Sequence, residues 1–224
     1  MTKPLRGALE IILPYFSASK KVLEIGSRYP NNEKSLVDLR SLFSDKINYT
    51  GVDISLGKGV DVVSDGENLP FENNSFDLVL CLETLEHAKH PWLVAKEIKR
   101  VVKKSGTIII STPFNHEIHF HPSDYYRYTP YGLRELFKSF KNKILFSISP
   151  PFQDEVKTHP QTIVLVASSG ESKDLFNKII KSLIENKDKI SVHKPYRHRV
   201  FDMIKYFRRG LNEFYFRQDI SFFK

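Results

Sequence analysis

Acidic side chains follow three short apolar runs near the beginning of this 224-residue sequence. Glu24 stands two residues before Gly26, Asp53 ends the second run, and Asp65 follows the third. If the runs are parallel strands, these carboxylates meet at the carboxyl edge of the sheet, where open α/β sheets bind ligands. Carboxylates accept hydrogen bonds from an ammonium group, a vicinal diol or an amino group. The set therefore suits a ligand that carries an ammonium, a ribose diol and an adenine amino group.

The loop after the first run argues against a dinucleotide. A pyrophosphate cradle requires the pattern Gly-x-Gly-x-x-Gly, whose backbone amides hold the phosphates. Here Gly26 is followed by Ser27-Arg28-Tyr29-Pro30, without a second or third glycine. The first loop is therefore not expected to bind a pyrophosphate.

A second group of polar side chains lies in the long segment 112–129, which contains three histidines, an aspartate and several aromatic residues. Long loops inside a compact domain tend to be functional. The lone Cys81 sits inside an apolar run and is expected to be a core thiol, which excludes a disulfide framework and a cysteine zinc cluster.

Length and composition set the class of protein. The chain is long enough for one large domain, its apolar content of 41% excludes a disordered chain, and it has no run of ~18 apolar residues that could span a membrane. The N-terminus lacks a secretory signal, so a cytoplasmic location is expected.

Apolar β-rich runs alternate with amphipathic helical segments, which predicts an α/β fold with a doubly wound, mostly parallel sheet and helices on both faces. Seven strands are predicted, at Lys21–Ile25, Asn48–Asp53, Val60–Val63, Phe76–Leu82, Gly106–Ser111, Ile144–Ser149 and Thr162–Ala167. Helices are predicted from Pro4 to about Phe16, at Glu33–Phe43 with Asn31 or Asn32 as cap, at Pro91–Val102, and from the cap Thr129 to about Phe140.

Six motifs in order resemble the class I S-adenosylmethionine-dependent methyltransferases, specifically the subgroup that acts on small molecules of quinone, sterol and glycan pathways. The resemblance covers roughly Lys21–Ser168, and the motifs read Val22-Leu-Glu-Ile-Gly, Gly51-Val-Asp-Ile-Ser, Asp65-Gly-Glu-Asn-Leu-Pro-Phe, Ser75-Phe-Asp-Leu-Val, Leu85-Glu-His-x-x-x-Pro and Glu97-Ile-x-Arg-Val-Val-Lys-Lys-Ser-Gly-Thr. The resemblance implies a seven-stranded Rossmann-like fold and S-adenosylmethionine as the methyl donor.

The resemblance also implies a donor site. Glu24 and Gly26 would shape the turn beside the methionine part, Asp53 would accept both ribose hydroxyls, and Asp65 would accept the adenine amino group. The full expected set is Glu24, Gly26, Ser27, Asp53, Ile54, Asp65, Gly66 and Leu82. Arg28 and Pro30 stand where the family commonly has further glycines, so a catalytically silent binding or scaffold protein is an alternative.

Transfer to a hydroxyl requires a base, and histidine titrates near neutral pH. His87, which follows the fourth strand, is the first candidate; alternatively it only organises the loop. Asp124 is the second predicted catalytic residue, and together with Arg127 it could bind pairs of hydroxyls on a saccharide or glycolipid precursor. The expected acceptor-side residues are His116, His119, His121, Tyr125, Tyr126 and Arg127. An aromatic lid that only closes the site is the alternative for this segment.

A Glu-x-x-Glu-His run resembles the divalent-metal motif of quinone-biosynthesis and small-RNA O-methyltransferases. Glu83, Glu86 and His87 would be ligands, with His119 or His121 as the fourth. Such an ion would lower the pKa of a hydroxyl. Leu-Glu-His is also common in metal-independent relatives, so a metal is not favoured.

The net charge of +8 belongs mostly to residues 173–224, with 13 Lys and Arg against 6 Asp and Glu. We expect a methyltransferase domain at 1–170 and a basic helical extension at 171–224. A helix at 197–217 would meet an anionic membrane or a lipid-linked acceptor at the inner membrane surface, or pack on its own core or on a twin subunit in a homodimer. An RNA substrate is disfavoured because the charge lies away from the predicted site.

Overall fold

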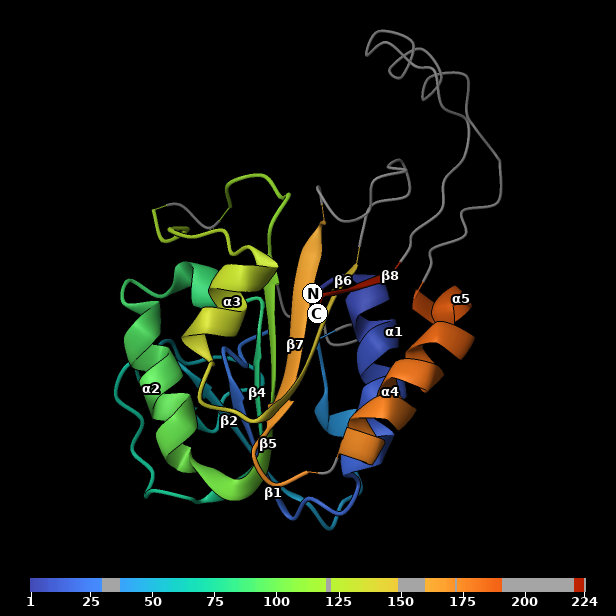
Figure 1. Ribbon diagram of the computed structural model, residues 1–224. Coiled ribbons are helices and arrows are strands. Elements are labelled where there is room, and N and C mark those ends of the chain that lie inside the picture. Colours follow the sequence, from blue (N-terminus) through green and yellow to red (C-terminus); the bar gives the residue numbers. More distant parts are fainter. Residues whose placement is uncertain (30–36, 120–121, 149–159, 172, 191–219, 224) are drawn as a thin grey trace, which may run out of the picture.

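The computed structural model describes residues 1–29, 37–119, 122–148, 160–171, 173–190 and 220–223, which form one sheet covered by helices on both faces (Figure 1). The strands are β1 (Lys21–Ile25), β2 (Asn48–Asp53), β3 (Val62–Val63), β4 (Phe76–Leu82), β5 (Val102–Pro113), β6 (Asn142–Ile148), β7 (Thr162–Ser168) and β8 (Ile220–Phe223). The helices are α1 (Lys3–Ile12), α2 (Pro91–Val101), α3 (Pro130–Leu136), α4 (Lys173–Glu185) and α5 (Lys187–Ile190), with short 3-10 turns at η1 (Leu13–Phe16), η3 (Arg40–Leu42) and η4 (Leu85–His87).

The strand order is β3-β2-β1-β4-β5-β7-β6-β8. The first five strands in this order are mutually parallel, whereas β7 runs antiparallel to both β5 and β6. The predicted mostly parallel sheet is confirmed, but the described sheet has eight strands because β8 adds to the edge of β6. As a result, the carboxyl ends of β1, β2 and β4 meet at one edge of the sheet.

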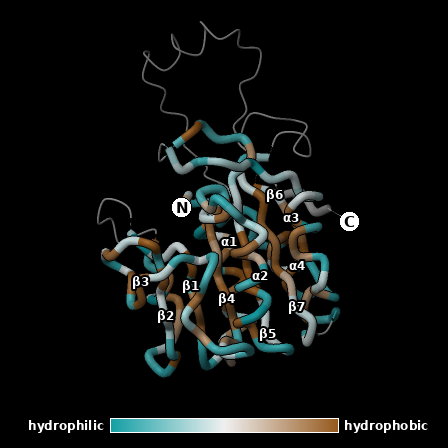
Figure 2. Tube along the Cα trace, turned by 90° about the vertical axis from the view of Figure 1, so that its left-hand side faces the viewer, coloured by the Kyte–Doolittle hydropathy of each residue, from teal (hydrophilic) through white to brown (hydrophobic). Residues whose placement is uncertain are grey.

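Alternating residues of the strands feed two separate cores. Leu23, Val79 and Ile108 pack under α2 and α3, while Val22 and Leu78 pack under the helices of the opposite face. Figure 1 shows α2 and α3 on one side of the sheet and α1, α4 and α5 on the other. The hydrophobic colour in Figure 2 is concentrated on the central strands, as burial on both faces requires.

Three of the four predicted helices begin within one residue of their predicted starts. Thr2 caps α1, and Thr129 Oγ1 accepts from the Gly132 amide 3.1 Å away at the start of α3. α2 begins at Pro91, whose fixed φ suits the first turn. The predicted extensions to Phe16 and Phe140 are too long, since α1 passes into a 3-10 turn and α3 ends at Leu136.

The prediction of a helix at Glu33–Phe43 is wrong for its described part. Residues 30–36 lie outside the described residues, and 37–43 contain only the turn η3. Asp38 Oδ1 accepts from the Arg40 amide at 3.1 Å, a local side-chain bond that competes with helix formation. The Arg40 side chain then reaches the Gly59 carbonyl oxygen at 3.0 Å and pairs with Asp61, which ties the turn to β2 and β3.

The described part of the C-terminal quarter packs on the sheet. Phe176, Ile179 and Leu183 of α4 are buried in the same core as α1. Residues 191–219, and with them the predicted helix at 197–217, lie outside the described residues, so the membrane, dimer and domain predictions stay predictions. Within the described ranges, no helix combines the length and apolarity that a membrane crossing needs.

Candidate functional site

A cavity of about 780 Å³ opens at the carboxyl edge of β1, β2 and β4. This volume lies within the range of roughly 300–1,000 Å³ that is usual for small-molecule sites. All eight residues predicted for the donor site line it: Glu24, Gly26, Ser27, Asp53, Ile54, Asp65, Gly66 and Leu82. The strand order brings them together from four separate motifs, and their individual roles stay predictions.

Asp53 is held in one orientation at the end of β2. Its Oδ1 accepts from the Ser55 amide at 3.0 Å, and its Oδ2 accepts from the Arg28 amide at 3.3 Å. Each carboxylate oxygen can accept more than one hydrogen bond, so both can still receive a ligand hydroxyl. The backbone thus aligns this carboxylate before a ligand arrives.

Gly26 is the position in the first loop that requires a glycine. Its φ is +80°, and a Cβ there would overlap the Thr84 side chain. Thr84 Oγ1 donates to a carbonyl oxygen, either that of Leu82 at 2.9 Å or that of Ile25 at 3.3 Å. Thr84 therefore joins the ends of β1 and β4 at the cavity wall, a role that no sequence motif indicated.

Glu24 is buried at the cavity, with 8% of its surface exposed. Its Oε2 accepts from the Tyr49 hydroxyl at 2.7 Å. Burial raises the pKa of Glu24 to about 7, although the Tyr49 hydrogen bond and the Arg40 charge oppose the shift. Tyr49 was missed because β2 was interpreted only from its last residue, although strand alternation places Tyr49 on the same side as Gly51, which pairs with Glu24.

His87 also lines the cavity, in the turn η4 that follows β4. Its Nδ1 lies 2.5 Å from the Ser123 carbonyl oxygen, which can only accept, so Nδ1 carries the proton and Nε2 the lone pair in the neutral ring. Burial lowers the pKa of His87 below its ordinary value of 6.5, which favours this neutral form. The Nε2 atom faces Glu86 Oε1 at 3.7 Å.

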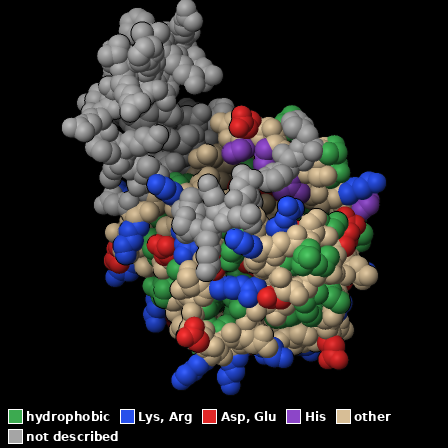
Figure 3. Space-filling view, turned by 180° about the vertical axis from the view of Figure 1, so that it is seen from behind, with side chains coloured by type: hydrophobic (Ala, Val, Ile, Leu, Met, Phe, Trp, Pro, Cys, Tyr) green, Lys and Arg blue, Asp and Glu red, His purple; other side chains and the backbone are tan. Residues whose placement is uncertain are grey.

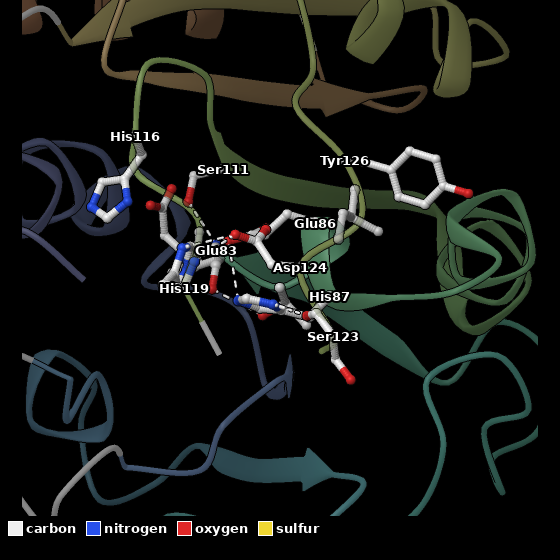
Figure 4. A network of polar contacts seen from close by, with 12 residues as sticks. Glu83, Glu86, His87, Ser111, His116, His119, Ser123, Asp124 and Tyr126 are labelled. Carbon is white, nitrogen blue, oxygen red and sulfur yellow. Dashed lines mark hydrogen bonds and ion pairs between the residues drawn. The ribbon is translucent and has the colours of Figure 1, made fainter. Parts of the chain in front are cut away.

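Two carboxyl groups, of Glu83 and Glu86, lie close to the histidines (Figure 4). Glu86 is fully buried, and neither of its side-chain oxygens has a hydrogen-bond partner among the described residues. Burial, followed by the neighbouring charge of Glu83, raises its pKa well above the ordinary value. Ligand atoms of Glu86, His87 and His119 all lie within 4.8 Å of one another, so this part of the predicted metal set does come together.

Two of the three histidines of the long loop lie at the cavity. His116 and His119 line the cavity. The distance between their ring centroids is 4.9 Å, and the ring centroids of His119 and His87 are 4.8 Å apart. Histidine side chains also gather at one place on the surface seen in Figure 3. His121 lies outside the described residues.

The prediction that Asp124 is catalytic does not fit its surroundings. Its side chain is 1% exposed and outside the cavity lining. Arg127 binds both carboxylate oxygens, at 2.5 and 2.7 Å, and the His119 amide donates at 2.8 Å. The Arg127 hydrogen bond holds the pKa of Asp124 far below its usual range. Asp124 therefore holds the loop that carries His119 and is not placed to act as a base.

The other acceptor-side predictions fit poorly as well. Arg127 is engaged by Asp124 and by the carbonyl oxygens of Tyr126 and Glu117, so its fork is occupied within the loop. Tyr126 donates to the Lys89 carbonyl at 3.2 Å, and its ring points away from the cluster in Figure 4. Tyr125 is 48% exposed, and neither tyrosine lines the cavity. Ser123 does line it and was not predicted.

Part of the chain matches a known family model. Residues 37–110 match the methyltransferase domain family. An uncharacterized protein of Methanocaldococcus jannaschii is 41% identical over 68 residues, 27% of this chain and 33% of that protein. An uncharacterized methyltransferase of Mycobacterium tuberculosis is 31% identical over 67 residues, 30% of this chain and 26% of that protein. The matched segments span a third or less of these relatives.

Solved structures share the fold at low identity. A SAM-dependent methyltransferase from Archaeoglobus fulgidus has a TM-score of 0.55 at 18% identity, covering 73% of this chain and 92% of that one. The 1,6-didemethyltoxoflavin-N1-methyltransferase of Burkholderia thailandensis, crystallised with S-adenosylhomocysteine, has a TM-score of 0.52 at 17% identity, covering 73% and 77%. The sheet order and these likenesses give the chain the Rossmann-like fold of class I methyltransferases.

Proposed function

We propose that this chain, which carries a methyltransferase domain in the class I fold, transfers the methyl group of S-adenosylmethionine to a hydroxyl of a small polar acceptor. The observation that carries the proposal is the convergence of Glu24, Asp53 and Asp65 on one cavity. These carboxylates match the ammonium, the ribose diol and the adenine amino group of that donor. The matching family segment, residues 37–110, contains two of the three.

The chemistry required of the protein is modest. The donor brings an activated methyl group, so the protein must align the acceptor oxygen with it and remove a proton. The acceptor oxygen forms the new bond to carbon as the carbon–sulfur bond breaks and the electron pair remains on sulfur. We assign the proton to His87 Nε2, because Ser123 holds the opposite ring nitrogen and burial keeps the ring neutral.

For the acceptor we propose a saccharide or glycolipid precursor. His87, His116 and His119 give the cavity a wall of polar aromatic rings, which can contact both hydroxyls and apolar ring faces. A lipid-linked form of the acceptor and membrane contact through 197–217 belong to this proposal, with co-sedimentation on anionic vesicles as their test.

Two measurements test the proposal in turn. Titration with S-adenosylhomocysteine in a calorimeter should give saturable binding of one ligand per chain. Incubation with methyl-labelled donor and a panel of sugars, nucleotide sugars and quinone precursors should then label at least one hydroxyl compound. Absence of donor or product binding in the folded protein would reject the donor site, and binding without any transfer would support the silent-scaffold alternative.

A metal-assisted version of the reaction is the second candidate. The observation in its favour is Glu86, which lies beside His87 and His119 and whose buried oxygens have no hydrogen-bond partner in the described part of the chain. The residues present fit a divalent ion, since His119 Nδ1 also faces the Glu117 carbonyl and Asp124, the usual outer contacts of a metal-binding histidine. Such an ion would lower the pKa of the acceptor hydroxyl.

Metal binding can be measured without activity. The protein is stripped with a chelator and titrated with Mn²⁺, Mg²⁺ or Zn²⁺ in a calorimeter, next to the Glu86→Gln variant. The metal-assisted candidate expects one ion per chain, with affinity lost in the variant, and transfer that stops on chelation and returns with the ion. Transfer that persists in chelator would leave His87 as the base.

A further inference from the structure

The wall of the cavity includes a buried carboxyl group that takes no part in the methyl transfer step itself. Glu24 is a carboxyl in the wall of the donor site, buried to 8% exposure, with its Oε2 bound by the Tyr49 hydroxyl at 2.7 Å. Carboxyl groups are rarely buried this far without a positively charged partner in contact. Among the described residues, no ion pair to Glu24 meets the 4.0 Å distance limit for a salt bridge.

Tyr49 is itself held in a built network. The Arg40 guanidinium lies over its ring, 5.0 Å from the centroid. Arg40 is in turn fixed by the Gly59 carbonyl oxygen and by Asp61, which also accepts from the Gly51 amide at 2.7 Å. The hydroxyl that binds Glu24 therefore belongs to a set of contacts that joins η3, β2 and the segment before β3. That set leaves Tyr49 little freedom to turn away from Glu24.

We propose that Tyr49 is a positioning residue of the donor site, and that Glu24 gives up a proton when the ammonium group of the donor or product binds beside it. The inference rests on the proposed function for the identity of the ligand. Binding of the charged amine then includes a proton leaving Glu24 for solvent, so that a neutral buried carboxylic acid becomes a carboxylate paired with the ammonium. The methyl transfer step itself neither adds a proton to Glu24 nor removes one.

The groups around Glu24 determine when the proton leaves. Burial raises the pKa of Glu24 to about 7, and the charges of Asp38 and Asp53 act in the same direction. The Tyr49 hydrogen bond and the Arg40 charge act against them. The neighbouring Tyr29 and Cys81 are also influenced by Glu24, but burial keeps both neutral in the range of interest. A cation within ~4–6 Å lowers a carboxyl pKa by roughly 1–3 units, enough to ionise Glu24 at neutral pH.

The sign of the pH effect follows. Below the pKa of Glu24 in the ligand-free protein, the ligand must displace a proton, so its affinity falls as the pH falls. Above that pKa, Glu24 is already ionised before the ligand binds, so the affinity no longer depends on its proton. We expect the Kd of S-adenosylhomocysteine to be about tenfold higher at pH 6 than at pH 8. We also expect release of about 0.9 proton per ligand at pH 6 and less than about 0.1 at pH 8.5, given a pKa near 7.

The experiment is calorimetric titration of the full chain with S-adenosylhomocysteine in pairs of buffers with different ionisation enthalpies, from pH 5.5 to 8.5. Glu24→Gln should abolish both the proton release and the pH dependence while binding persists with reduced affinity. Tyr49→Phe removes a bond that favours the charged carboxylate, so it should move the midpoint of proton release to higher pH. A structural role alone would lower affinity at every pH and leave the midpoint in place.

Two controls keep the readout specific. Tyr15→Phe removes a hydroxyl that donates to the Lys178 carbonyl, away from the cavity, and should leave the midpoint unchanged. His87→Asn removes another group that lines the cavity and should preserve the Glu24 midpoint. Product binding with a flat Kd and no proton release would overturn the inference and leave the proposed function intact. No product binding at any pH would instead overturn the proposed donor site.

Discussion

Asp53 offers the sharpest test of the donor site because its carboxylate is exposed to the cavity and held by backbone amides. Asp53→Ala should weaken binding of S-adenosylhomocysteine at least tenfold, since each hydrogen bond to a charged group contributes about 1.5–3 kcal/mol. Calorimetry measures the loss, and circular dichroism checks that the fold is retained. Unchanged affinity in a folded variant would remove Asp53 from the site.

His87 should affect the reaction more than binding. His87→Ala removes the group to which we assign the acceptor proton, and a base contributes typically 10²–10⁴-fold to the rate. We expect kcat at saturating donor to fall by that order, while the Kd for S-adenosylhomocysteine changes less than about threefold. If kcat is unaffected, the base lies elsewhere; if Kd changes as much as kcat, His87 holds the ligand or the loop.

At this scale the convergence of the three donor-site carboxylates on one cavity could be predicted, whereas the contacts of the loop residues could not. Glu24, Asp53 and Asp65 follow apolar runs, and strand ends are readable from such runs. Asp124 is different, because the sequence shows its charge but not that Arg127 three residues later binds both of its oxygens. The Tyr49 hydroxyl was hidden for a similar reason, since its partner Glu24 is reached only through the register of β1 against β2.

Among the elements, α3 depends visibly on its cap. Thr129 Oγ1 accepts from the Gly132 amide, one of the N-terminal amides that the helix leaves unpaired. Thr129→Ala should cost about 1 kcal/mol and lower the Tm by roughly 2–4 °C, whereas Thr129→Ser keeps the oxygen and most of the stability. Differential scanning calorimetry of both variants decides. Equal losses would mean that the methyl group of Thr129, not its hydroxyl, stabilises the turn.

Element boundaries were predictable where the local signal agreed with tertiary contacts. The bounds of β1, β2 and β4 coincide with the predicted ranges, because Asp53 ends the run of β2 and glycine or polar residues directly follow the runs of β1 and β4. β5 is longer than predicted, as Thr112 and Pro113 pair with Ile163 and Thr162 of β7, contacts that depend on a distant segment. The segment 37–43 fails as a helix because the Asp38 side chain captures a backbone amide.

For the whole molecule, alternating strands and helices indicated the layers, but the reversal of β7 and the addition of β8 depend on long-range pairing. The predicted domain boundary at residue 170 also involves contacts between segments that are far apart in the sequence. If residues 1–170 formed a separate domain, the face of α1 that α4 covers would be exposed. In the structure, α4 buries three large side chains, Phe176, Ile179 and Leu183. Packing across this boundary therefore predicts that the two parts unfold together.

A matched pair of substitutions in α4 tests that prediction. Ile179 is fully buried, whereas Ile184 on the same helix is 55% exposed. Ile179→Ala should lower the free energy of unfolding by about 2–5 kcal/mol, because it leaves a cavity between α4 and the sheet, while Ile184→Ala should change it by less than about 0.5 kcal/mol.

Urea unfolding of the full chain, followed by both circular dichroism and Trp92 fluorescence, measures the loss and shows whether one transition carries both signals. An independent 1–170 domain would instead leave the Trp92 transition of Ile179→Ala at its original midpoint, since Trp92 lies on α2 across the sheet. A shift of both signals by the same amount would establish that α4 is part of the folding unit that positions the cavity.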